Sequence, residues 1–197
     1  MKLSIFMGSP RSTGNTAMLL APFLDECARL GAETERVELY QRVIQPCLGC
    51  MVCQDCMDGP GCVQRDDFDD LFHKMTNSDA VVLATPIYAW YCTPPMKALL
   101  DRAIYAGNKN YGREKGPALL KGLRVASIVT CGYRPEKGAD LWEEGLRRFC
   151  RHSRAVYLGM LCRRDLGRSV PFLDQEKEQA AREFARMVCR ALGEERT

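Results

Sequence analysis

The sequence has no apolar run long enough to cross a membrane. Its longest strongly apolar segment, 80–84, is far shorter than the roughly 20 residues that a membrane-spanning helix needs. The first residues hold one lysine and reach Gly8-Ser9-Pro10 too early to contain the apolar region and cleavage site of a signal peptide. We therefore expect no membrane association and a cytoplasmic location.

The sequence also has little net charge, few histidines and no repeats. A formal net charge of +3 is too small to indicate a nucleic-acid partner, and the chain has no internal repeat or low-complexity tract. The two histidines, His73 and His152, lie in charged segments where solvation explains them. We assign no catalytic residue.

Two nucleotide-binding fingerprints are missing. The loop after the first apolar segment, 8–16, lacks the Gly-Lys-Ser/Thr ending of a Walker loop and is not Gly-x-Gly-x-x-Gly. It is rich in amides and hydroxyls and opens a predicted helix, whose N-terminus presents unpaired N–H groups and a positive dipole end. The loop therefore predicts a site for a terminal phosphate. The candidate ligands are Ser9, Arg11, Ser12, Asn15 and Thr16.

Short apolar segments alternate with amphipathic ones along the chain. This alternation predicts an α/β fold with a five-stranded parallel sheet between two helical layers, because each crossover helix packs its apolar stripe onto the strands. A length of 197 residues suits one domain. The expected strands are 2–7, 34–39, 79–84, 123–130 and 154–160, and the expected helices are 15–30, 66–77, 94–105, 137–152 and 174–192.

The loop after the third predicted strand, 85–95, contains three aromatic residues and three prolines. In a sheet of order 2-1-3-4-5, ligands bind at the carboxyl ends of the first and third strands. The aromatic side chains Tyr88 and Trp90 would therefore lie beside a flat apolar ring such as an isoalloxazine. The alternative is an aromatic loop that packs against its own core.

Five of the eleven cysteines fall within residues 47–62. Thiols stay reduced in the cytosol, so metal or redox chemistry is more typical here than disulfides. Three interpretations remain open: a [4Fe-4S] cluster, a structural zinc, and thiols without metal. An unbroken Cys-x2-Cys-x2-Cys triplet disfavours zinc, which usually takes two separated pairs. Cys56 and Cys62 both remain candidates for a fourth ligand.

Several motifs together resemble one protein family. The motifs are Gly8-Ser9-Pro10-Arg11, Gly14-Asn15-Thr16, Pro86-Ile87-Tyr88, Lys97 and Asp101-Arg102, and they resemble the NADPH-dependent FMN reductase family of flavodoxin-like proteins. The cysteine stretch, followed by Val63 and Asp66-Asp67, is similar to the iron–sulfur flavoprotein branch, whose motif is Cys-x2-Cys-x2-Cys-x4–7-Cys. The resemblance implies one flavodoxin-like FMN-binding domain over 1–197, with a cysteine-rich insertion at 45–65.

The resemblance also implies the positions of two cofactors. The phosphate of FMN would lie at Ser9, Arg11, Asn15 and Thr16, and its ring would lie at Pro86, Ile87, Tyr88 and Ala89, with Trp90 in the same loop and Cys131 and Gly132 at the other edge. The implied cluster ligands are Cys47, Cys50, Cys53 and Cys62. The gap before Cys62 is one residue longer than the motif and contains Cys56, but Val63 and Asp66 follow Cys62 as they follow the last ligand of the family.

The function that follows is redox chemistry at FMN. We expect an iron–sulfur flavoprotein, a homodimer or homotetramer, that passes electrons between FMN, a [4Fe-4S] cluster and a redox partner such as a ferredoxin. The alternative is an NAD(P)H-dependent FMN or quinone reductase without a cluster, for which NADPH is the transient donor. Because the insertion follows the second strand, it leaves from the same sheet edge as the flavin loops, and the two cofactors would be close within one subunit or across a dimer.

Overall fold

The computed structural model describes residues 1–194, in which strands and helices alternate along the chain. The last three residues of the expected 1–197 domain lie outside this range. The elements are β1 (Lys2–Met7), α1 (Asn15–Arg29), β2 (Glu33–Glu38), the short 3-10 helices η1 (Leu39–Gln41) and η2 (Val52–Asp55), α2 (Phe68–Thr76), β3 (Ala80–Pro86), α3 (Pro94–Gly107), β4 (Arg124–Cys131), α4 (Pro135–Gly138), α5 (Asp140–Ser153), β5 (Val156–Arg164) and α6 (Gln175–Gly193).

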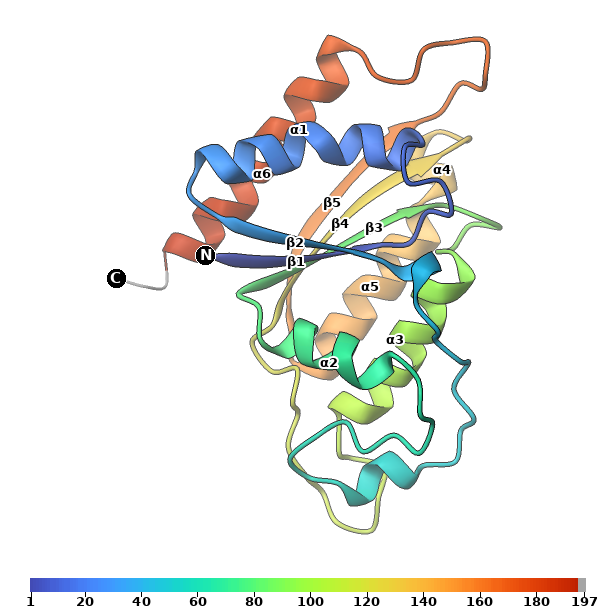
Figure 1. Cartoon of the computed structure of the whole chain (residues 1–197), viewed down its shortest axis with the longest axis vertical. Helices are drawn as coiled ribbons and strands as arrows, with labels where there is room; N and C mark the ends of the chain where they lie inside the picture. Colours follow the sequence, from blue (N-terminus) through green and yellow to red (C-terminus); the bar gives the residue numbers. More distant parts are fainter. Residues whose placement is uncertain (195–197) are drawn as a thin grey trace.

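The strands form one parallel sheet in the order β2-β1-β3-β4-β5. This order confirms the predicted fold class, a flavodoxin-like three-layer α/β sandwich. Parallel pairing places the carboxyl ends of all five strands at one edge of the sheet (Figure 1). The loops after β1, β3 and β4 therefore meet at that edge, as ligand-binding loops do in open parallel sheets.

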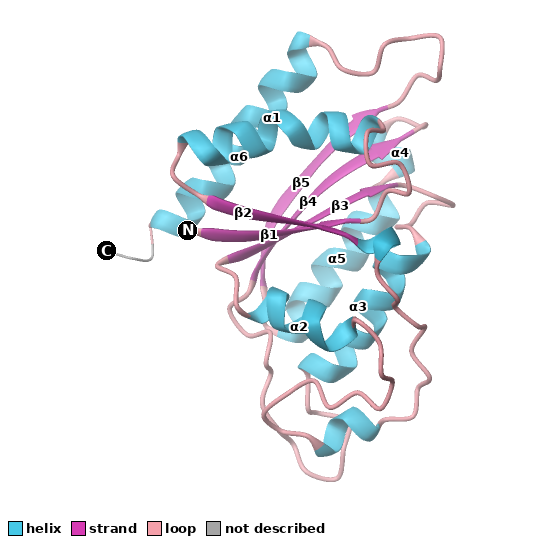
Figure 2. Ribbon diagram, in the orientation of Figure 1, coloured by secondary structure: helices cyan, strands magenta, loops and turns pink. Residues whose placement is uncertain are grey.

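The sheet is covered on both faces (Figure 2). Helices α1 and α6 pack on one face, and α2, α3 and α5 pack on the other. Successive residues of β1 point to opposite faces, so Leu3 and Ile5 join the core beneath α1 and α6, whereas Phe6 joins the core beneath α2, α3 and α5. Among residues 1–194, no helix combines the length and apolarity needed to cross a membrane.

Most predicted boundaries agree with the structure within two residues, but two elements differ. The helix predicted over 137–152 is divided into α4 and α5 at Ala139, where φ is −123° and ψ is 1°. A Cβ on Gly138 would lie 3.1 Å from the Sγ of Cys131, the last residue of β4, so α4 packs closely on the end of β4. Strand β5 begins at Val156 and runs to Arg164, beyond the predicted end at Met160.

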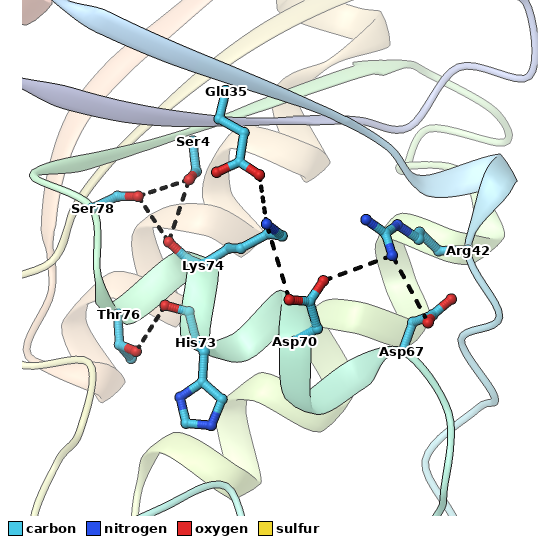
Figure 3. A network of polar contacts seen from close by, with 9 residues as sticks. All are labelled: Ser4, Glu35, Arg42, Asp67, Asp70, His73, Lys74, Thr76 and Ser78. Atoms are coloured by element: carbon cyan, nitrogen blue, oxygen red, sulfur yellow. Dashed lines mark hydrogen bonds and ion pairs between the residues drawn. The ribbon is translucent and has the colours of Figure 1, made fainter.

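A polar network fastens α2 to β1 and β2 (Figure 3). Lys74 Nζ lies 2.5 Å from Glu35 Oε1, and the hydroxyls of Ser4 and Ser78 are 2.7 Å apart. Val43 and Asp67 exchange two further hydrogen bonds, of 2.7 and 3.0 Å, which join the chain before the cysteine insertion to the chain after it. The two ends of the insertion are therefore held together at the start of α2. The side chain of His73 points away from the network and takes no part in it.

Candidate functional site

The first helix begins without a side-chain cap. Helix α1 follows Gly14, no side chain accepts from its first amides, and its first turn contains no acidic residue. The first N–H groups of a helix have no intrahelical partner, and they carry the positive end of the helix dipole. The start of α1 is therefore electrostatically suited to an anion.

Glycine at position 14 allows Arg11 to fold over the start of α1. A Cβ at Gly14 would lie 2.9 Å from the Cβ of Arg11, closer than real Cβ contacts allow, and 3.1 Å from its Nε. Arg11 and Ser12 are exposed, and the Ser12 carbonyl accepts a hydrogen bond of 2.9 Å from Arg36. Ser9 is buried, and its Oγ accepts from the Arg11 N–H at 3.2 Å. Two guanidinium groups therefore border the loop.

Thr16 is oriented differently from the other predicted phosphate ligands. Its side chain is buried, and its Oγ1 lies 2.8 Å from Thr130 Oγ1 near the end of β4. This hydroxyl pair holds α1 against the carboxyl edge of the sheet, so Thr16 offers an anion its backbone N–H and not its hydroxyl. Thr93 has a similar role on the other side, because its Oγ1 donates to the Gly8 carbonyl at 2.6 Å.

An open pocket of about 270 Å³ lies between the loops after β3 and β4. We call it the aromatic pocket, and it is lined by Ile87, Ala89, Trp90, Cys131, Gly132, Tyr133 and Gly138. Five of these residues were predicted at the flavin ring. The predicted Pro86 and Tyr88 adjoin the pocket in sequence but do not line it. The Trp90 and Tyr133 rings are stacked, with centroids 5.9 Å apart, and each presents about half or more of its surface to solvent.

The turn that carries Trp90 is strained. Ala89 and Trp90 both have positive φ, 47° and 63°, and backbone hydrogen bonds of 2.8 and 2.9 Å join Tyr88 and Tyr91 on either side. This is the geometry of a type I′ turn, which normally takes Asn and Gly. Residues with a Cβ in the left-handed region cost free energy, and such strain concentrates at functional sites. The turn holds the Trp90 ring beside the pocket.

The predicted cluster ligands share a second pocket. We call it the cysteine pocket, and it is lined by Cys47, Cys50, Cys53 and Cys62 together with Leu48, Gly49, Met51, Val63, Gln64 and three residues of α3, Arg102, Tyr105 and Ala106. Cys56 is not among these residues. The Sγ of Cys56 lies 3.5 Å from Asp58 Oδ1. A Cβ on Gly61 would lie 2.3 Å from the Cβ of Cys56. The structure thus places Cys62, and not Cys56, beside the triplet.

All eleven cysteines are free thiols in the structure. Across residues 1–194, no three side chains of cysteine, histidine, aspartate or glutamate are arranged as a metal site. The four thiols are linked by the pocket that they share and not by ligand geometry. Thiols are the donors that iron–sulfur clusters and structural zinc take, so the donor set fits either centre.

Arg102 forms one wall of the cysteine pocket. Its Nη2 donates to Cys62 Sγ at 3.1 Å, its Nη1 donates to Asp66 at 2.5 Å, and its guanidinium lies 4.2 Å from the Phe68 ring centroid. The side chains of Arg102 and Asp66 are 1% and 3% exposed. Arg102 Nε is buried without a hydrogen-bond partner. An orphaned N–H in this wall fits a group that brings acceptor atoms into the pocket.

The insertion is also fastened to the chain that follows α3. Gln54 is buried, and its amide nitrogen donates to the carbonyls of Tyr105, at 2.6 Å, and Asn108, at 3.1 Å. Lys109 is buried, its ammonium donates to the carbonyls of Cys53 and Pro60, and burial lowers its pKa. Neither Gln54 nor Lys109 is predictable from the sequence, because nothing in their local pattern distinguishes them from surface residues.

Helix α3 separates the two pockets. The loop that bears Trp90 leads directly into Pro94 at the start of the helix, whereas the cysteine pocket contacts the helix from Arg102 onward. At about 1.5 Å per residue, the rise from Pro94 to Arg102 is roughly 12 Å. The insertion leaves from the carboxyl edge of the sheet, as expected, but then runs back along α3 (Figure 1).

Comparison with known proteins identifies a family. Residues 1–160 match the family described as NADPH-dependent FMN reductase. An iron-sulfur flavoprotein of Archaeoglobus fulgidus is 38% identical over 129 residues, which cover 66% of this chain and 54% of that protein. An iron-sulfur flavoprotein of Methanosarcina thermophila is 32% identical over 124 residues, which cover 62% and 63% of the two chains. The chain thus spans between about half and two thirds of the length of these relatives.

Solved structures share the fold. The FMN-dependent NADH-azoreductase of Bacillus anthracis, solved in complex with FMN, superposes with a TM-score of 0.69. The match covers 98% of this chain and 100% of that chain at 16% sequence identity, so the likeness extends to the fold alone.

Proposed function

The chain belongs to the NADPH-dependent FMN reductase family, and from that membership we propose that it is a redox flavoprotein with two cofactors, FMN and a [4Fe-4S] cluster. In this proposal, residues 1–197 form one FMN-binding domain with the cysteine insertion at 45–65. The protein is a flavin-dependent oxidoreductase, works in the cytoplasm as a homodimer or homotetramer, and exchanges electrons with a partner such as a ferredoxin.

The FMN site would occupy the carboxyl edge of the sheet. Bound FMN supplies hydride and one-electron chemistry, and the protein supplies position and electrostatics. The uncapped start of α1 and the guanidinium of Arg11 would neutralise the phosphate, with Ser9, Ser12 and Asn15 as further donors. The residues of the aromatic pocket would contact the ring, and Trp90 and Tyr133 would exclude water from one side of it.

The observation that carries the cluster proposal is the shared pocket of the four thiols. A [4Fe-4S] cluster supplies one-electron transfer and takes four cysteine thiolates. Cys47, Cys50, Cys53 and Cys62 would hold it, and the N–H groups of Arg102 would face its sulfur atoms. We propose Cys62 as the fourth ligand because it lines the pocket and accepts from Arg102, whereas Cys56 lies outside.

A matched pair of cysteine variants tests this proposal. After anaerobic purification, we expect about four irons and one FMN for each wild-type chain, as this cofactor pair requires. The Cys62→Ser variant should lose most of its iron and keep its FMN, whereas Cys56→Ser should keep both. Iron at background level in the wild-type protein, with a normal flavin content, would refute the cluster.

A second candidate is an NAD(P)H-dependent reductase of FMN or quinones that works without a cluster. The open aromatic pocket favours it, because the exposed rings of Trp90 and Tyr133 offer a stacking surface to a flat nicotinamide or quinone. Steady-state oxidation of NADPH and NADH by the pure protein, with and without free FMN, separates the two candidates. An electron carrier should turn over slowly with both nucleotides, and rapid turnover would establish the reductase.

A further inference from the structure

Lys109 places a positive charge inside the fold, beneath the cysteine insertion. The residue is 0% exposed, and its Nζ donates to the carbonyls of Cys53, at 2.8 Å, and Pro60, at 3.3 Å. These two carbonyls lie at the start and near the end of the segment from Cys53 to Cys62. The Lys109 ammonium therefore links the two ends of this segment. It also lies next to the backbone of Cys53, a proposed cluster ligand.

The backbone holds Lys109 in this position. Its N–H donates to the Pro117 carbonyl at 3.1 Å, its own carbonyl accepts from Gly116 at 2.5 Å, and the neighbouring Asn108 forms an antiparallel bridge with Ala118. A Cβ on Gly116 would lie 2.6 Å from the Cβ of Lys109, so this close approach requires glycine. These backbone contacts fix the position of Lys109 and direct its side chain into the insertion.

The ammonium is not paired with a carboxylate. Its hydrogen-bond partners among residues 1–194 are the two carbonyls, and Asp58 influences it electrostatically without forming an ion pair. A buried charge without a counter-charge is costly, and proteins normally pair it. Arg102 contrasts with Lys109, because Asp66 balances its charge. Lys109 therefore places one buried positive charge without a carboxylate partner against the insertion, and the thiols are the groups beside it that can become anionic.

We propose that Lys109 is the counter-charge of the centre held in the cysteine pocket. Its ammonium links Cys53 to Pro60 and raises the reduction potential of that centre. The inference rests on the cluster in the proposed function. Four thiolates give a [4Fe-4S] centre a net negative charge, and each added electron increases it. A fixed cation in a region of low dielectric constant stabilises the reduced form more than the oxidised form. Lys109 is a positioning and tuning residue, not a catalytic one.

The test compares three variants of the holoprotein. Lys109→Met removes the charge and keeps a long side chain, and Lys109→Arg keeps the charge. Lys115→Met removes an exposed charge from the same loop. The reduction potential of the cluster is measured by an EPR-monitored redox titration, with iron and FMN contents determined on the same samples. We expect K109M to shift the one-electron equilibrium toward the oxidised cluster about tenfold, which is about 59 mV. K109R and K115M should stay near the wild-type potential.

Each outcome decides the inference. A wild-type potential in K109M, with iron retained, overturns it and leaves the proposed cluster intact. Absence of iron from the wild-type protein overturns both the cluster and the inference. If K109M cannot hold iron while it keeps FMN and its far-UV circular dichroism, K109R decides the result. Iron at the wild-type level in K109R supports the counter-charge, and equal loss in both variants overturns it.

Discussion

At the scale of single residues, the buried pair of Arg102 and Asp66 supports the cysteine pocket. Asp66 also accepts backbone hydrogen bonds from Gln45, at 2.8 Å, and Phe68, at 3.1 Å. One carboxylate thus joins the first residue of the insertion, the start of α2 and the side chain of Arg102 in α3. Because both charges are almost fully buried, removal of either one leaves the other without compensation.

We predict that Arg102→Met lowers the free energy of unfolding by about 3–5 kcal/mol, the range found when one partner of a buried ion pair is removed. Arg148→Met is the matched control, because its ion pair with Glu144 is exposed and should contribute only about 0–1 kcal/mol. Urea unfolding of the two variants at equal cofactor loading measures the difference. Similar losses of unfolding free energy in both variants would show that the buried pair of Arg102 and Asp66 stabilises the fold no more than an exposed ion pair.

Asp66 should also make stability depend on pH. Burial raises the pKa of Asp66, but hydrogen bonds from Arg102 and from the Gln45 and Phe68 amides outweigh it and hold this pKa below its ordinary value. A carboxylate with a lowered folded-state pKa contributes its stability above the unfolded pKa, about 3.9, and loses it as the pH falls through the folded pKa. The stability difference between wild type and Asp66→Asn should therefore be full at pH 6 and shrink below about pH 4. Urea midpoints between pH 3 and pH 7 test this, and a constant difference would contradict it.

Functional residues that belong to a sequence motif could be predicted, and those outside any motif could not. The spacing of Cys47, Cys50 and Cys53 identified them from the sequence, and the structure places them in one pocket. Lys109 and Gln54 act through hydrogen bonds to residues 56 and 51 positions away, and only the folded chain brings these partners together. Cys56 and Cys62 both remained candidates for the fourth ligand, because the choice between them depends on how the segment between them turns.

At the scale of elements, the turn between β3 and α3 stores strain beside the aromatic pocket. The sequence indicated an aromatic loop rich in proline, but not the two positive φ angles, because Ala89 and Trp90 are atypical of a type I′ turn. Similarly, the division of the helix predicted over 137–152 depends on the close packing of Gly138 on the end of β4. Periodicity identifies a helix, whereas such tertiary contacts decide where it ends.

Relief of this strain is measurable. Ala89→Gly should raise the free energy of unfolding by roughly 0.5–1 kcal/mol, because glycine adopts positive φ without the steric cost of a Cβ, a gain partly offset by its greater freedom in the unfolded chain. The same substitution at Ala180, within α6, should lower it by about 1 kcal/mol. Thermal unfolding of both variants tests for opposite signs. Destabilisation by Ala89→Gly would mean that the strain in this turn is small.

At the scale of the whole molecule, the parallel sheet brings the loops after β1, β3 and β4 to one edge, and α3 carries the chain from that edge to the cysteine pocket. The sequence predicted the strand order and therefore this edge. It did not predict that the insertion folds back along α3, because the anchors at Arg102, Gln54 and Lys109 are long-range contacts. One helix therefore joins the two pockets, which we propose as the two cofactor sites.

Two sites at different positions along α3 should lose their cofactors independently. In the combined variant Cys47→Ser/Cys50→Ser/Cys53→Ser, we expect iron to be lost while the Kd for FMN stays within about twofold of wild type, since none of these thiols lines the aromatic pocket. Conversely, Arg11→Ala should weaken FMN binding by about tenfold or more, because it would remove the charge-assisted contact that we propose between Arg11 and the phosphate, and should leave the iron content unchanged. Fluorescence titration with FMN and iron assays on both variants measure this double dissociation. Loss of FMN from the cysteine variant would mean that the insertion forms part of the flavin site, and that the separation along α3 does not divide the functions of the molecule.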